Sequence, residues 1–195
     1  MKLLTTKLLK IIFTFSLLIL FSSCFGLSFD IVLNSNGSGT IDLEYRISKS
    51  IDSLGRLDGN ERWNTIPVGR ADFERTLDRL PELRLLSFSE KEEERDLVIG
   101  VKIEFKAIKD LLAFLDAGGR RSSFSGDTAS GRLVLTLSEG AESNNQSLNK
   151  LIAEVFDSYS VNMSMSFPGG RRVSHSFPLY EILSSSERIT VEFNW

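Results

Sequence analysis

The chain is poor in the residues that most often carry chemistry: its 195 residues include one cysteine, Cys24, and one histidine, His175. A single thiol cannot form an intramolecular disulfide or a cysteine-based metal site. The histidine stands between Ser174 and Ser176 without a partner for a catalytic triad or a metal site, so a solvent-exposed strand position explains it better. The sequence also lacks a Gly-x-Ser-x-Gly nucleophile motif. We therefore expect a protein that is not an enzyme and that has no metal and no cofactor.

Clusters of positive charge and long apolar runs are also scarce. Lys and Arg total 23 against 26 Asp and Glu residues, which gives a formal net charge of −3. An acidic chain without a large Lys/Arg block argues against nucleic acid as a partner. Only residues 11–21 form a long apolar run, which is shorter than the ~20 residues that span a bilayer comfortably. We expect the remainder of the chain to fold as a soluble domain beside a membrane.

The N-terminal segment has the pattern of a secretory leader. Three lysines precede the apolar run: Lys2, Lys7 and Lys10. After the run, Phe21-Ser22-Ser23-Cys24 resembles a bacterial lipobox, whose cysteine is diacylated and becomes the mature N-terminus, although Phe21 departs from the commonest form with Leu. Two acyl chains satisfy the requirement for stable membrane anchoring. We predict a signal peptide over 1–23, lipidation of Cys24, and export to the cell membrane or outer membrane; ordinary secretion and an uncleaved anchor are the alternatives.

The remaining residues, 24–195, are expected to form one domain. They number 172 once residues 1–23 are removed from the chain of 195, and their formal charge is about −6 because three lysines leave with the leader. Alternation of apolar and polar residues dominates this part and predicts half-buried strands. The predicted strands cover 27–33, 41–47, 83–88, 97–105, 133–137, 161–167 and 189–195. Turns rich in Asn and Gly follow the first strand, and a Pro-Gly-Gly turn begins at Pro168.

In three segments the apolar period changes to 3.6 residues, which predicts amphipathic helices over 70–80, 108–115 and 146–158. A short helix or turn is expected over 177–183. Residues 49–69 are expected to be irregular, with a helical turn near Ile51, and 90–96 to form a charged hairpin tip. The predicted fold class is α+β: a largely antiparallel curved sheet of about eight strands, with three or so amphipathic helices packed on one face.

Three segments of the chain resemble the LppM-type domain of bacterial lipoproteins. They are Phe29 to Leu43, Val101 to Leu112, and Phe167-Pro168-Gly169-Gly170 with the final strand that closes in Trp195. Together they frame nearly the whole mature chain, and none is a catalytic signature. The resemblance implies a membrane-anchored domain with a curved sheet and helices, similar to lipid- or glycolipid-binding folds. Many members of that family carry a second transmembrane segment after the domain. We expect none here, a departure from the family that would leave acylated Cys24 as the sole anchor.

The most suggestive local feature is a doubled Gly-Gly-Arg-Arg tetrapeptide, at 118–121 and 169–172. Glycine amides can form anion-binding concavities, and guanidinium groups pair with phosphate bidentately. If the two loops met, Arg120, Arg121, Arg171 and Arg172 could hold an anionic lipid head group. Two solvated turns explain the same pattern.

The alternating residues Met163, Met165 and Phe167 admit two interpretations as well. They could line a pocket for an acyl chain, since methionine adapts to irregular apolar partners, or they could be ordinary core. We expect a non-enzymatic envelope lipoprotein that binds a lipid, a glycolipid or another amphiphile. The alternative is a tethered structural or protein-interaction module without a small ligand, with an exposed apolar patch near Trp63 or the final strand.

Overall fold

The computed structural model describes residues 26–49, 69–94, 96–116, 119–140, 146–157 and 159–195. These residues form nine strands and four helices. The strands are β1 (Leu27–Leu33), β2 (Gly39–Ser48), β3 (Leu83–Glu92), β4 (Asp96–Phe105), β5 (Ser122–Gly126), β6 (Gly131–Ser138), β7 (Ser160–Ser166), β8 (Arg172–Pro178) and β9 (Ile189–Asn194). The helices are α3 (Arg70–Leu77), α4 (Ile108–Leu115), α5 (Gln146–Phe156) and α6 (Leu179–Ser184).

The strands make two sheets. The larger has six strands in the order β3-β4-β2-β1-β7-β8, and the smaller has three in the order β5-β6-β9. All neighbours are antiparallel except β1 and β7, which pair in parallel. The predicted α+β class with a mostly antiparallel sheet is therefore confirmed, and the strand and helix numbers are close to those expected.

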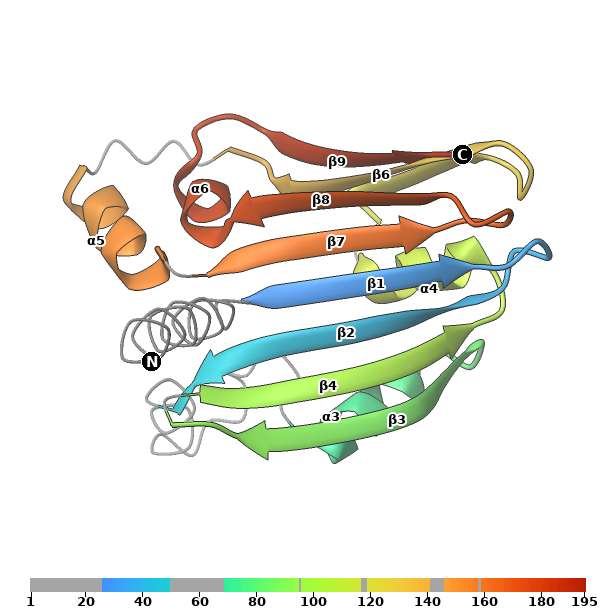
Figure 1. Cartoon of the computed structure of the whole chain (residues 1–195), viewed down its shortest axis with the longest axis horizontal. Coiled ribbons are helices and arrows are strands. Elements are labelled where there is room, and N and C mark those ends of the chain that lie inside the picture. The colour runs from blue at the N-terminus through green and yellow to red at the C-terminus, as the bar shows by residue number, and fades with distance from the viewer. Residues whose placement is uncertain (1–25, 50–68, 95, 117–118, 141–145, 158) are drawn as a thin grey trace, which may run out of the picture.

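One apolar core lies behind the six-stranded sheet. Figure 1 shows α3 and α4 on the same side of this sheet, so that side is covered. The inward residues of the central strands alternate with outward polar ones, as in β4, where every second residue from Leu97 to Phe105 is buried. Leu133, Val191 and Phe193 of the smaller sheet belong to the same buried cluster. The period-2 pattern thus gives the larger sheet a dry face and an open face.

Carboxylates fix the beginnings of the two covering helices. Asp72 accepts the Gly69 N–H at 3.1 Å ahead of α3, and Asp110 accepts the Ala107 N–H at 2.9 Å ahead of α4. Each bond satisfies a backbone donor that the helix itself leaves unpaired. Phe73 and Leu77 then bury the inner side of α3, and Ile108 and Leu111 bury that of α4. The apolar stripes predicted for these helices therefore face the sheet.

The structure differs from the sequence-based expectations at several boundaries. The helix predicted over 70–80 ends at Leu77. The charged segment predicted as a hairpin tip is mostly strand, because β3 runs on to Glu92 and β4 begins at Asp96, with the Glu93 N–H bonded to the Asp96 carbonyl at 2.8 Å. Strand β5 was not expected, and of β8 only the strand position of His175 was.

Some predictions fall outside the residues that the structure describes. They are the signal peptide, Cys24, Trp63 and the helical turn near Ile51. Among the helices in the described part of the chain, none has the combination of length and hydropathy that crossing a bilayer requires.

Candidate functional site

The open face of the six-stranded sheet, opposite α3 and α4, is its most distinctive surface. Strand pairing aligns its outward residues in rows that cross all six strands. One row consists of Ser87, Lys102, Asp42, Asp30, Ser164 and Ser174. The next consists of Ser89, Gly100, Glu44, Ser28, Asn162 and Ser176. Half of these twelve positions are serine, so the open face is polar and has short side chains.

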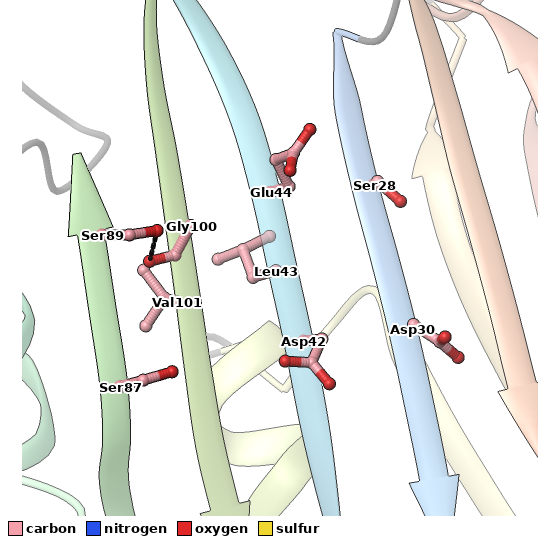
Figure 2. A pocket seen from close by; sticks show the side chains of 9 residues that line it. All are labelled: Ser28, Asp30, Asp42, Leu43, Glu44, Ser87, Ser89, Gly100 and Val101. Atoms are coloured by element: carbon pink, nitrogen blue, oxygen red, sulfur yellow. Dashed lines mark hydrogen bonds between the residues drawn. The ribbon is translucent and has the colours of Figure 1, made fainter. Parts of the chain in front are cut away.

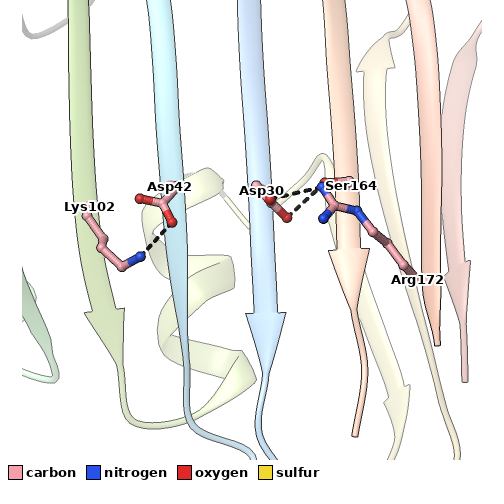
Figure 3. A network of polar contacts seen from close by, with 5 residues as sticks. All are labelled: Asp30, Asp42, Lys102, Ser164 and Arg172. Atoms are coloured by element: carbon pink, nitrogen blue, oxygen red, sulfur yellow. Dashed lines mark hydrogen bonds and ion pairs between the residues drawn. The ribbon is translucent and has the colours of Figure 1, made fainter. Parts of the chain in front are cut away.

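A network of charges crosses the middle of the open face (Figure 3). Asp30 and Asp42 lie directly opposite each other on β1 and β2, which would be unfavourable for two unpaired like charges. Lys102 Nζ lies 2.7 Å from Asp42 Oδ2, and an Arg172 terminal nitrogen lies 2.9 Å from Asp30 Oδ2. The Ser164 hydroxyl donates to Asp30 Oδ1 at 2.8 Å. Each carboxylate therefore has its own cation, and both are held in place.

Next to this network the open face is hollowed into a depression of about 380 Å³ (Figure 2). Its lining residues come from β1, β2, β3 and β4: Ser28, Asp30, Asp42, Leu43, Glu44, Ser87, Ser89, Gly100 and Val101. Leu43 and Val101 are buried in the core on the other face, so they contribute backbone to the floor. Gly100 has no side chain and leaves the middle of this floor open.

Several polar groups of the depression are not used by the fold. The side chains of Ser28, Ser87 and Glu44 make no hydrogen bond or ion pair with any residue in the described part of the chain. Ser89 donates only a long bond, 3.3 Å, to the Gly100 carbonyl. Asp42 uses Oδ2 for Lys102, which leaves Oδ1 available to accept from another donor. The depression thus offers hydroxyls, which donate and accept, beside carboxylates, which accept.

The described residues include no group of three or more His, Cys, Asp and Glu side chains placed as metal ligands would be. The acidic residues of the depression, Asp30 on β1 and Asp42 and Glu44 on β2, lie on neighbouring strands, and Asp30 and Asp42 are each paired with a cation. These residues can form hydrogen bonds with a polar molecule that lies on the open face of the sheet.

The structure does not bring the two arginine pairs together. Arg121 precedes β5, and its carbonyl accepts the Thr136 N–H of β6 at 2.6 Å. Arg171 and Arg172 follow the turn after Phe167, whose ring stacks on Trp195, and Trp195 pairs through its backbone with Gly131. Gly131 and Thr136 are five residues apart on β6, or roughly 17 Å along a strand.

The four arginines therefore do not form one grip on a head group. Arg120, Arg121 and Arg171 are exposed beyond the strand ends, while Arg172 is part of the open face through its ion pair with Asp30. A head-group role for either pair alone stays a prediction.

The other residues considered from sequence lie in the core or beside it. Met163, Met165 and Phe167 are 3%, 0% and 5% exposed and belong to the main apolar cluster. His175 lies on a strand, as expected, but is half-buried rather than solvent-exposed. Its Nε2 is 3.1 Å from the Glu192 carbonyl oxygen of β9, and its ring meets that of Phe193 edge-on at 5.2 Å. His175 therefore lies between β8 and β9, the neighbouring edge strands of the two sheets.

Sequence reasoning did not single out the residues of the depression. Asp30, Asp42 and Glu44 each look like an ordinary outward residue of an alternating strand. One feature of the sequence could have indicated the depression. Successive outward residues of these strands are serine or glycine, where longer polar side chains are usual.

Comparison with protein-family models and with curated proteins finds no match for this chain. The resemblance to the LppM-type domain accordingly stays a prediction.

Proposed function

We propose that this chain is a non-enzymatic bacterial envelope lipoprotein, anchored through diacylated Cys24, whose folded domain binds a polar ligand on the open face. The ligand that suits this proposal best is the head group of a glycolipid or of another envelope amphiphile. The observation that carries the proposal is the depression, in which the side chains of Ser28, Ser87 and Glu44 make no hydrogen bond or ion pair within the described part of the chain. The lipobox-like segment that ends at Cys24 supports the anchor.

The burial of the apolar residues bears on which part of an amphiphile would be bound. Met163 and Met165 are inside a close-packed cluster, so they are committed to stability. An acyl chain would have to displace core residues, whereas a head group would meet groups that are already exposed. The proposal therefore concerns the polar end of the ligand.

Native mass spectrometry of the full-length protein, purified in detergent from bacterial membranes, tests both the lipid anchor and the binding of a glycolipid. We expect a covalent mass increase that corresponds to a diacylated N-terminal cysteine, and a non-covalent adduct with the mass of a glycolipid. The Cys24→Ser variant should lose the covalent increase. An unmodified mass for the original chain contradicts the anchor, and consistent absence of any adduct contradicts glycolipid binding.

A tethered protein-interaction module is the second candidate, and the packed core favours it, because it needs no internal space. It predicts that the same preparation carries a protein partner, detectable by cross-linking, and no lipid adduct. The open face would be the docking surface in that case, so substitutions there would remove the cross-link.

A further inference from the structure

We infer that the depression between β1, β2, β3 and β4 is a sugar-binding site for a neutral, polyhydroxylated ring. This inference rests on the proposed function and specifies the ligand class that the open face would recognise. It is drawn from three properties of the depression: its hydrogen-bonding groups, its charge balance and its shape.

The hydrogen-bonding groups require a ligand that both donates and accepts. Glu44 and Oδ1 of Asp42 can only accept, so the ligand must bring donors to them. The Ser28 and Ser87 hydroxyls can supply donors in return. A sugar hydroxyl meets both demands, and neighbouring hydroxyls of a ring can share one carboxylate. A phosphate group only accepts and would face three carboxylates, so this site does not suit an anion.

The charge balance of the depression also excludes a ligand with several positive charges. Asp42 and Asp30 are already paired with Lys102 and Arg172. Among the charges that line the depression, Glu44 alone has no counterion in the described part of the chain. The site therefore accommodates a neutral ligand, or one that carries a single amine, and not a polycation.

The shape depends on Gly100. A Cβ at this position would stand 2.6 Å from the Ser89 hydroxyl oxygen, so any side chain here would occupy the depression. The bare backbone of the floor can receive the flat C–H side of a ring, while the rim groups reach its hydroxyls. A volume of about 380 Å³ is near the lower end for small-ligand sites, as one or two sugar rings would require.

The test fills the depression without disturbing the sheet. Gly100 is not among the glycines with positive φ, so Gly100→Leu can keep the strand conformation if the Ser89 side chain turns aside. Ser174→Leu is the matched control, because Ser174 is exposed on β8 of the same open face and does not line the depression. Far-UV circular dichroism and the melting temperature verify that both variants fold.

Each full-length protein, labelled and kept in detergent, is then applied to an array of immobilised mono- to tetrasaccharides. We expect the original chain to bind a subset of neutral sugars, Gly100→Leu to lose at least tenfold in signal, and Ser174→Leu to match the original chain. Glu44→Gln keeps the shape and removes the charge, and should lose several-fold.

An original chain that binds no sugar, or a folded Gly100→Leu protein that binds like the original, overturns the inference. The same proteins are also analysed by native mass spectrometry, so that the two proposals can fail separately. A glycolipid adduct that persists in Gly100→Leu leaves the proposed function standing and removes the site from the depression. Loss of the adduct and of the array signal together supports both.

Discussion

At the scale of single residues, Tyr45 shows how the core constrains a titratable group. It is buried among the inward residues of β2, and its ring centroid lies 6.5 Å from that of Phe73 on α3. Burial raises the pKa of the Tyr45 phenol well above its ordinary value, and the nearby Asp72 carboxylate raises it further. The folded protein therefore holds this group neutral.

The pH dependence of stability follows from that shift. A free tyrosine has a pKa of about 10, and the folded value is higher, so the contribution of Tyr45 is complete below the unfolded pKa and is lost as pH rises toward the folded one. We expect the free energy of unfolding to fall by up to ~1.4 kcal/mol per pH unit above pH 10 on this account. Urea unfolding at pH 8, 10 and 11 measures it. Tyr45→Phe should fall less steeply, and equal slopes for the two proteins would contradict the prediction.

The charged residues of the open face show what a sequence leaves undetermined at this scale. Alternation along β1 and β2 placed Asp30 and Asp42 on the outside correctly. That they oppose each other depends on the register between two strands, and that Arg172 pairs with Asp30 depends on contacts across 142 positions of sequence. Neither relation can be seen in local patterns, which is why the network and the depression beside it were not predicted.

At the scale of elements, Trp195 connects the ends of several strands. Its ring stacks on Phe124 of β5 and on Phe167, which follows β7, with centroids 5.8 and 5.1 Å apart. Its indole N–H donates to the Asp127 carbonyl in the β5–β6 turn at 3.1 Å. A Cβ on Gly131 would stand 2.4 Å from this ring, so glycine is needed there for the close approach. One side chain thus ties the smaller sheet to the larger.

We expect Trp195→Ala to lower the free energy of unfolding by about 2–3 kcal/mol, somewhat less than for a fully buried tryptophan because the ring is half-buried. Trp195→Phe should recover part of the loss by keeping one stacked ring. Val32→Ala, at an exposed position on β1, serves as the control and should stay within ~0.5 kcal/mol of the original chain. Urea titration at neutral pH gives all three values. A Trp195→Ala protein as stable as the control would show that the stack does not hold the sheets together.

The elements that sequence predicted well are those with strong periodicity, such as β1, β2, β4 and α4. Strand β5 was missed because its five residues include one large apolar side chain, Phe124, among serines and a glycine. Strand β8 was missed because serines separate inward residues that are only half-buried. In β3, the doubled leucine at 85 and 86 marks a bulge that shifts the alternation, so Leu86 faces outward and is 41% exposed. Periodicity therefore fails to predict strands at the edge of a sheet, where inward residues are only half-buried, and at a bulge, where the alternation shifts.

At the scale of the whole molecule, the order of the chain interleaves the two sheets. The larger sheet takes strands from both halves, because β1 pairs with β7, and Ser164 bonds to Asp30 across 134 positions. The smaller sheet takes β5 and β6 from the middle and β9 from the end. Alternation in the sequence predicts which side of each strand is buried, but it does not predict which strands are neighbours. The strand order of the two sheets could therefore not be predicted from the sequence.

We therefore expect the described domain to unfold in one cooperative step. In a Trp63→Phe variant, Trp195 is the remaining tryptophan of the two in the chain, so fluorescence reports on the junction of the sheets. Its urea transition should coincide with the one followed by far-UV circular dichroism, which averages over the whole fold. Two separate midpoints would mean that the smaller sheet melts independently of the larger one.

The position of β1 has a mechanical consequence. This strand begins three residues after Cys24 and is the fourth of the six in its sheet, bonded to β2 on one side and to β7 on the other. A pull on a tether at Cys24 would act along β1, while its ladder bonds run across it. Under such a pull, the hydrogen bonds of both ladders would have to break together in shear and would not open one at a time. A tether at this end would therefore apply force in the direction in which the sheet resists it most.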